Sequence, residues 1–252
     1  MHDRKILAKD YQEQFLNNDY YKDTRFDSIT VENFLSDSEL LAFEKASQSS
    51  SITHVHDQHA PQHVETVANY WIFQNFYTDP AWEHLVDIIQ PKLQAQFGDD
   101  IMASHIHILD SKFPYGVHND AEQTSLEIAP DPAWTIIIPL DDYESKTYVF
   151  NERSHYKDPI LMAEALGIEP YDTPAVDEET FQKDFHPYTG LNVLQYLTVE
   201  TTFKWKKGSC FAADRFKYHC SDNYYNHGLD GKRAIIIWTS KKINFKKDEN
   251  KG

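Results

Sequence analysis

The chain has 252 residues, enough for one domain with a substantial hydrophobic core. Hydrophobic residues make up 40% of it and aromatic residues 14%, which predicts a folded protein and not a disordered one. A formal net charge of -16 repels polyanions, so we expect no nucleic acid and no anionic membrane as partner. No apolar run approaches the roughly 20 residues that span a bilayer. The first residues lack the apolar stretch of a secretory signal, so we expect a soluble, cytoplasmic protein with reduced cysteines.

The N-terminal part of the chain predicts short strands and two helices. Residues 26–47 are typical of a strand followed by a helix, because Ser36 and Glu39 have the spacing of a capping box. A polar segment with several histidines follows and is interpreted as a solvated loop: His54, His56, His59 and His63. Residues 69–77 have the aromatic content of a strand. A second helix is expected from Pro80, with Pro91 as a candidate kink and these apolar residues at helical spacing: Trp82, Leu85, Val86, Ile89, Leu93 and Phe97.

From residue 101 onward the pattern changes to short strands separated by turns. Such a succession is typical of a β-sandwich or barrel, with the two N-terminal helices packed outside it. We therefore predict a single domain over residues 1–252. The expected strands are 101–110, 133–140, 147–151, 197–205, 208–213 and 232–240.

A polar stretch interrupts this strand pattern between Asn151 and Val193. It contains several prolines, many acidic residues and one short apolar segment, 160–167, that predicts a helix. Long connections in compact domains are usually functional or mobile. We therefore expect residues 152–192 to form an insertion that covers one end of the barrel and changes mobility when substrate binds.

Metal chemistry is indicated by His118 and Asp120, two positions apart, together with the remote His219. A non-haem Fe(II) that must also accept a chelating co-substrate and O2 uses three protein ligands on one face. Two imidazoles and one carboxylate supply that set. An H-x-D pair alone is common by chance in a chain with 13 His and 40 acidic residues. His227 is a rival for the remote ligand, although it lies in a turn rich in Tyr and Asn.

The surrounding segments resemble the 2-oxoglutarate and Fe(II)-dependent dioxygenase superfamily over residues 28–240. The run KKGSCFAADRFKYHCSDN is similar to the family segment that ends in the distal histidine, and it places Gly208 eleven residues before His219. GKRAIIIWTS resembles the next family strand and places a basic residue, Arg233, fourteen residues after His219. ITVENFLSDSELLAF resembles the family's opening strand and helix.

This resemblance implies a mainly β fold with flanking α-helices: a double-stranded β-helix (jelly-roll, cupin-like) with the N-terminal helices packed outside. It implies that His118, Asp120 and His219 bind Fe(II). It also implies that Arg233 binds the far carboxylate of 2-oxoglutarate, which suits the planar fork of arginine. Many members have Arg-x-Ser on that strand, but here the third residue is Ile235, so a hydroxyl must come from elsewhere. The candidates are Thr135, Tyr148 and Thr239.

We therefore expect a 2-oxoglutarate-dependent dioxygenase that uses O2 to hydroxylate a small molecule, amino acid or peptide and releases succinate and CO2. Family members that halogenate lack the acidic ligand, so Asp120 favours hydroxylation. His105 and His107 alternate along a strand and face one side, where they are candidates for lining the pocket. Two alternatives stay open. One is a cupin-type metalloenzyme that uses no 2-oxoglutarate, with Arg233 binding substrate, and the other is a non-catalytic β-helix domain that binds a partner.

Overall fold

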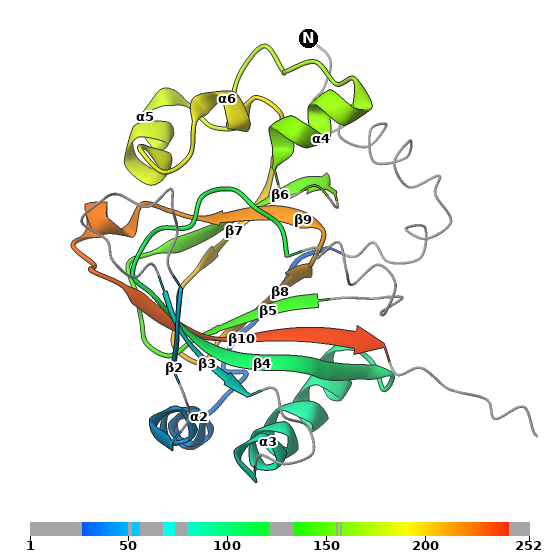
Figure 1. Cartoon of the computed structure of the whole chain (residues 1–252), viewed down its shortest axis with the longest axis vertical. Coiled ribbons are helices and arrows are strands. Elements are labelled where there is room, and N and C mark those ends of the chain that lie inside the picture. Colours follow the sequence, from blue (N-terminus) through cyan, green and yellow to red (C-terminus); the bar gives the residue numbers. More distant parts are fainter. Residues whose placement is uncertain are drawn as a thin grey trace, which may run out of the picture.

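The computed structural model describes residues 27–49, 52–55, 68–73, 80–120, 134–154, 156 and 158–241, which form mainly antiparallel strands (Figure 1). The strands are β1 (Ile29–Val31), β2 (Ile52–Val55), β3 (Ala68–Phe73), β4 (Ile101–Ser111), β5 (Trp134–Pro139), β6 (Lys146–Arg153), β7 (Val199–Lys204), β8 (Cys210–Asp214), β9 (Lys217–Ser221) and β10 (Lys232–Lys241). The helices are α2 (Asp37–Ser49), α3 (Pro80–Phe97), α4 (Pro159–Leu166), α5 (Glu178–Thr180), the π-helix η2 (Phe181–Phe185), α6 (Leu191–Leu194) and the 3-10 helix η3 (Tyr224–His227).

The strands form two sheets that face each other (Figure 1). The larger sheet has seven strands in the order β1-β8-β5-β10-β4-β3-β2, and the smaller has three in the order β7-β6-β9. Every pair of neighbouring strands among the described residues is antiparallel. The prediction of a mainly β protein is confirmed.

Helices α2 and α3 cover the outer face of the seven-stranded sheet (Figure 1). Phe43 of α2 and Ile89 of α3 share one core cluster with Ile235 of the sheet. Helix α2 begins at the predicted capping box, where the Ser36 N–H donates to Glu39 Oε2 at 2.7 Å. Within the described part of the chain, no helix is long and apolar enough to cross a membrane.

Strand β10 lies inside the seven-stranded sheet between β4 and β5 and is buried on both faces. Ile235 and Ile237 belong to the core cluster under α2 and α3, whereas Ala234 and Ile236 belong to a cluster shared with the other sheet. Successive side chains of a strand point to opposite faces. Odd-numbered residues up to Ile237 therefore face the helices, and even-numbered ones face the space between the sheets.

The space between the two sheets is filled by a second apolar cluster, which we call the inter-sheet core. Its members come from β5, β8 and β10 of the larger sheet and from β6 and β7 of the smaller one, with Trp205 just after β7. The buried members are Ile137, Val149, Phe203, Trp205, Phe211, Ala213, Ala234 and Ile236. A side chain on the same face as these residues points into the space between the sheets.

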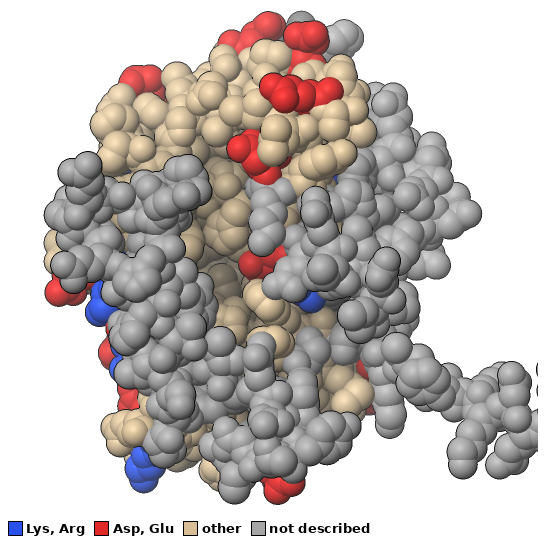
Figure 2. Space-filling view, in the orientation of Figure 1, with Lys and Arg blue, Asp and Glu red and all other residues tan. Residues whose placement is uncertain are grey.

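The segment between β6 and β7 packs on the outer face of the three-stranded sheet (Figure 1). Its Phe181 and Phe185 share a cluster with Tyr148 of β6 and Tyr218 of β9. The predicted helix at 160–167 is confirmed as α4. The segment forms a packed outer layer on this sheet. That it covers one end of the barrel and changes mobility when substrate binds stays a prediction. Acidic side chains gather on its exposed surface (Figure 2): Glu164, Glu169, Asp172, Asp177, Glu178 and Glu179.

Two strands were missed in the sequence. Strand β2 contains His54, so the interpretation of this residue as part of a loop is wrong; the other three histidines of that segment lie outside the described residues. Strand β9 carries Lys217 and His219, and most of it is buried. Tyr218 and Cys220 belong to the cluster beneath the insertion, so the alternate residues Lys217 and His219 point to the opposite face, where the sequence has no apolar side chain.

Replacing Phe185 with Ala should destabilise the protein by about 3–5 kcal/mol, because truncating a buried aromatic side chain leaves a cavity. Phe185 is 1% exposed in the cluster beneath the insertion, whereas Leu161 on α4 is 55% exposed. Urea unfolding measures the change in free energy, and Leu161→Ala is the matched control with little expected effect. Equal stability of the two variants would show that the insertion has no packed core.

Candidate active site

Two backbone hydrogen bonds bring the outer residues of the predicted triad together. His118 follows β4 and forms an isolated antiparallel bridge with His219 of β9. The His118 N–H donates to the His219 carbonyl at 3.0 Å, and the His219 N–H donates to the His118 carbonyl at 2.8 Å. The Asp120 N–H donates in turn to the Arg215 carbonyl at 3.0 Å. The main chain therefore fixes all three candidate ligands.

The side chains of the triad converge on one point. Their ligand atoms lie within 4.8 Å of one another, and Asp120 Oδ2 is 3.6 Å from His219 Nε2. His118 Nδ1 lies 2.8 Å from the Gly116 carbonyl, and His219 Nδ1 lies 3.2 Å from the Lys217 carbonyl. A carbonyl oxygen only accepts, so each Nδ1 carries a proton, and in the neutral imidazole the lone pair then lies on Nε2. Both histidines thus have the tautomer of a metal ligand bound through Nε2.

The Asp120 carboxylate is held by its neighbours in ionised form. Burial raises its pKa, but His219, His118, a hydrogen bond from Thr135 and the charge of Arg215 together bring the pKa below its ordinary value. The Thr135 hydroxyl donates to Asp120 Oδ2 at 2.6 Å. Arg215 Nη2 donates to the Asp120 carbonyl at 3.0 Å. Two imidazoles and one ionised carboxylate form the donor set that suits a non-haem Fe(II) with open positions.

A cluster of one cationic and three aromatic side chains lies near the triad. The Arg215 guanidinium lies 4.8 Å from the Trp238 ring centroid, and the His105 and His107 rings lie 5.1 and 5.7 Å from it. Burial, and then the charge of His105, lowers the pKa of His107 to about 3, against the opposing charge of Asp120. His107 is therefore neutral at physiological pH. Both histidines face the inter-sheet side of β4, as the sequence predicted.

Arg233 lies on the other face of β10. Its Nη1 is 3.7 Å from Glu44 Oε1 of α2, and its strand neighbour Ile235 lies in the helix-facing core. Backbone bonds hold this position, since the Arg233 N–H donates to Tyr143 Oη at 3.0 Å. Arg233 therefore faces the helix layer in this structure, and its contact with the far carboxylate of 2-oxoglutarate stays a prediction.

Lys232, one residue earlier, points into the space between the sheets and was not singled out in the sequence. Its Nζ lies 3.8 Å from the centroid of Trp205, a member of the inter-sheet core, and donates to Ser145 Oγ at 2.9 Å. The residue is 4% exposed. Lys232 is the first residue of β10, and in the sequence the adjacent Arg233 was taken as the basic residue of this strand.

The three predicted hydroxyl helpers take different positions. The Thr239 hydroxyl oxygen accepts the Trp134 N–H at 3.0 Å. Thr135 faces the inter-sheet side, where it is bonded to Asp120, so it positions a candidate metal ligand. Tyr148 faces outward and its hydroxyl donates to Asp184 of the insertion, and its contact with the co-substrate stays a prediction. The rival ligand His227 lies with its Nε2 3.6 Å from Asp222 Oδ2 and outside the triad.

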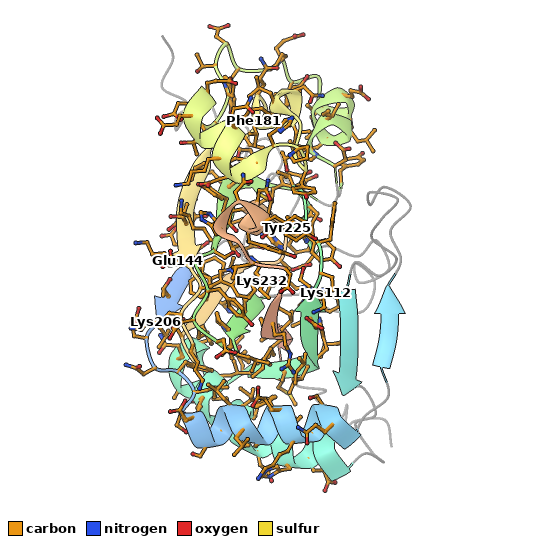
Figure 3. The ribbon with its side chains drawn as sticks, turned by 90° about the vertical axis from the view of Figure 1, so that its left-hand side faces the viewer. Lys112, Glu144, Phe181, Lys206, Tyr225 and Lys232 are labelled. Atoms are coloured by element: carbon orange, nitrogen blue, oxygen red, sulfur yellow. The ribbon has the colours of Figure 1, made fainter. Side chains whose placement is uncertain are left out.

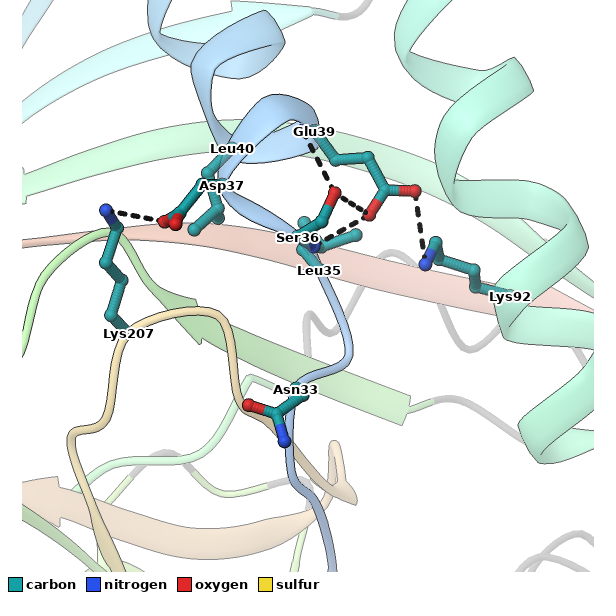
Figure 4. A pocket seen from close by; sticks show the side chains of 8 residues that line it. All are labelled: Asn33, Leu35, Ser36, Asp37, Glu39, Leu40, Lys92 and Lys207. Atoms are coloured by element: carbon teal, nitrogen blue, oxygen red, sulfur yellow. Dashed lines mark hydrogen bonds and ion pairs between the residues drawn. The ribbon is translucent and has the colours of Figure 1, made fainter.

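A surface pocket of about 500 Å³ lies at the start of α2, on the helix side of the larger sheet (Figure 4). Its charged groups are paired with one another, Lys92 with Glu39 at 3.1 Å and Lys207 with Asp37 at 2.8 Å. Ser36 completes the capping box there. These contacts indicate a structural role at the helix start, away from the triad.

No protein-family model and no curated protein matches the sequence. Solved structures do match. SnoN, a non-heme alpha ketoglutarate dependent epimerase from nogalamycin biosynthesis, is 14% identical with a TM-score of 0.53, covering 86% of this chain and 79% of its own. SnoK, a carbocyclase of the same pathway, is 14% identical with a TM-score of 0.52, covering 88% and 81%. An oxidoreductase of the 2OG-Fe(II) oxygenase family from Burkholderia pseudomallei is 10% identical with a TM-score of 0.51, covering 84% and 85%. The chain thus has the fold of these 2-oxoglutarate- and iron-dependent enzymes.

Replacing Thr135 with Val should weaken divalent-metal binding by about 10- to 100-fold, because a side chain that orients a metal ligand typically contributes that much. Calorimetric titration with Mn²⁺ measures the dissociation constant. Thr135→Ser keeps the hydroxyl that donates to Asp120 and should bind nearly as the wild type does. If the Val variant binds Mn²⁺ with unchanged affinity, the hydrogen bond does not support the site.

Proposed function

We propose that this chain is a 2-oxoglutarate- and Fe(II)-dependent oxygenase. The observation that carries the proposal is the convergence of His118, Asp120 and His219 within a fold shared with enzymes of this kind. One matching structure, of SnoN, is described as a complex with Fe3+, alpha ketoglutarate and nogalamycin RO. The facing sheets are the arrangement expected of a double-stranded β-helix, the fold that the sequence resemblance implies.

Fe(II) would be held by the two Nε2 atoms of His118 and His219 and by the Asp120 carboxylate. When bound, iron and 2-oxoglutarate supply an oxidant derived from O2, with succinate and CO2 as co-products. This chain supplies position and charge. The backbone bridge fixes both imidazoles, Thr135 orients the carboxylate, and the neutral His107 and the Trp238 ring border the site.

Lys232 is the cation that we propose for the distal carboxylate of 2-oxoglutarate. Val149 lies opposite His219 in the small sheet, and Thr147 lies opposite Ser221 one step further along the same face. The Thr147 hydroxyl accepts from Trp205 Nε1 at 2.9 Å, and the Trp205 ring contacts Lys232. Lys232 therefore lies along the same inter-sheet face as His219, separated from it by about two strand positions. Lys232 would supply the positive charge for the distal carboxylate of a 2-oxoglutarate held at the metal.

The proposed outcome is hydroxylation of a small molecule, amino acid or peptide. An acidic ligand in the triad and a site bordered by aromatic rings support it. SnoN and SnoK are an epimerase and a carbocyclase, so the fate of the substrate differs among enzymes of this fold. Mass analysis of the product decides between them, because hydroxylation adds one oxygen atom whereas epimerisation and ring closure do not.

Asp120→Ala should abolish succinate formation and reduce Mn²⁺ binding strongly, because two neutral imidazoles do not replace an anionic ligand. Metal content and succinate release measure the two effects. Asp184→Asn is the matched control: Asp184 is equally a buried carboxylate, but it lies on the insertion and bonds Lys146. Wild-type metal affinity in the Asp120 variant would contradict the proposed centre.

Lys232→Met should weaken 2-oxoglutarate binding by roughly 10- to 150-fold, the equivalent of about 1.5–3 kcal/mol for a charge-assisted hydrogen bond. Arg233→Met is the matched control, since it removes an adjacent cation that faces α2. Calorimetry with Mn²⁺ in place of Fe(II) measures the affinity of both variants. A larger loss of 2-oxoglutarate affinity in the Arg233 variant would indicate that Arg233, and not Lys232, binds the distal carboxylate.

A further inference from the structure

A buried ion network surrounds Lys232 near the middle of the molecule, beneath the segment that carries Tyr225 (Figure 3). Lys232 Nζ donates to Ser145 Oγ at 2.9 Å, and the Ser145 hydroxyl donates to Asp222 Oδ1 at 2.6 Å. One hydroxyl group therefore separates the ammonium of Lys232 from the carboxylate of Asp222. Asp222 is 0% exposed and takes no part in the proposed metal centre.

The Asp222 carboxylate is fixed in place. Its Oδ2 accepts the Lys146 N–H at 2.8 Å, and the Asp222 N–H donates to the Lys146 carbonyl at 3.0 Å. His227 Nε2 lies 3.6 Å from the same Oδ2. A carboxylate held by the main chain on one oxygen can offer the other oxygen in only one direction, and Ser145 lies in that direction.

Asp222 is the anion that faces Lys232. Among the described residues, Cys220 of β9 also influences the pKa of the lysine, and the Tyr224 ring centroid of η3 lies 5.1 Å from Lys232 Nζ. Burial raises the pKa of both, so they are neutral. Burial lowers the pKa of Lys232 itself to about 7, and the charge of Asp222 is the largest influence that opposes this. Burial also raises the pKa of Asp222, against the charge of Lys232.

We propose that Asp222 is a positioning residue for the co-substrate, which acts through Ser145 to hold the Lys232 ammonium charged and aimed along the inter-sheet face. This inference rests on the proposed function, in which Lys232 binds the distal carboxylate of 2-oxoglutarate. Asp222 touches neither the metal nor the co-substrate. Its effect on binding is transmitted by the bridging hydroxyl and by its charge.

The affinity for 2-oxoglutarate consequently depends on pH. Lys232 binds a carboxylate only when it is protonated, so affinity is full below the pKa of the free lysine and falls as pH rises through it, near pH 7. Removing the charge of Asp222 lowers that pKa further, because an opposite charge at this range shifts a pKa by about 1–3 units. The fall in affinity then begins at a lower pH in the variant.

The test compares 2-oxoglutarate binding to wild type and Asp222→Asn at pH 6 and pH 8, by calorimetry with Mn²⁺ loaded. At pH 8 the variant should bind about tenfold more weakly than wild type or worse, with a smaller deficit at pH 6. Titration of the metal centre affects both proteins alike and cancels in the ratio. Ser145→Ala, which removes only the bridge, should show a smaller deficit in the same direction and serves if the Asn variant does not fold.

An independent measurement needs neither metal nor co-substrate. Nuclear magnetic resonance of protein carrying ¹³Cε-labelled lysine follows the titration of Lys232, whose signal is identified by its loss in Lys232→Met. Its midpoint should lie near 7 in wild type and about 1–3 units lower in Asp222→Asn. Asp184→Asn should leave the midpoint unchanged, because Asp184 bonds Lys146 and Tyr148.

These experiments distinguish a failure of the proposed function from a failure of the proposed role of Asp222. If wild type binds no 2-oxoglutarate at any pH, the proposed function fails and this inference fails with it. If wild type binds and Lys232→Met weakens binding, but Asp222→Asn keeps the wild-type affinity at pH 8 and the wild-type lysine midpoint, only the role of Asp222 is overturned.

Discussion

The candidate site depends on one pair of backbone hydrogen bonds, those between His118 and His219. They join the loop after β4 of the seven-stranded sheet to β9 of the three-stranded sheet, at 3.0 and 2.8 Å. Because the main chain makes this link, the distance between the two imidazoles is set before any metal binds. Asp120 is held by two further hydrogen bonds, from the Thr135 hydroxyl to its carboxylate and from Arg215 to its carbonyl. A preformed site of this kind loses little conformational entropy when its ligand binds.

The side chains that face the space between the sheets include further polar and charged groups besides the triad. The candidate metal ligands, the neutral His107 and the buried Lys232 all point between the sheets, while Arg233 and Tyr148 point to the helix layer and to the insertion. Each of these two outward residues contacts an acidic side chain, Arg233 with Glu44 and Tyr148 with Asp184. Placement on one face or the other thus separates groups that bind ligands from groups that fasten outer layers to the sheets.

Much of this architecture could be predicted from the sequence, and the failures have physical causes. The capping box at Ser36, the apolar strand runs and the H-x-D pair with a remote histidine all depend on local patterns. The sequence does not show which face of β10 each residue occupies, because Ile235 and Ile236 are both apolar and both buried. Without an alternation of apolar and polar residues, it could not be predicted whether Lys232 or Arg233 points between the sheets. Strand β9 was missed because it is short and Lys217 and His219 alternate with its two buried core residues, Tyr218 and Cys220. The position of the insertion depends on tertiary contacts alone.

In the proposed site, the triad and Lys232 together bind the metal and 2-oxoglutarate. Anaerobic calorimetry of the protein with 2-oxoglutarate, before and after loading with Fe(II), tests this proposal most directly. We expect one 2-oxoglutarate to bind per chain and to require the metal, because the candidate ligands His118, Asp120 and His219 would hold the ion that one end of the co-substrate chelates. Absence of binding, or binding of equal strength without Fe(II), would contradict it.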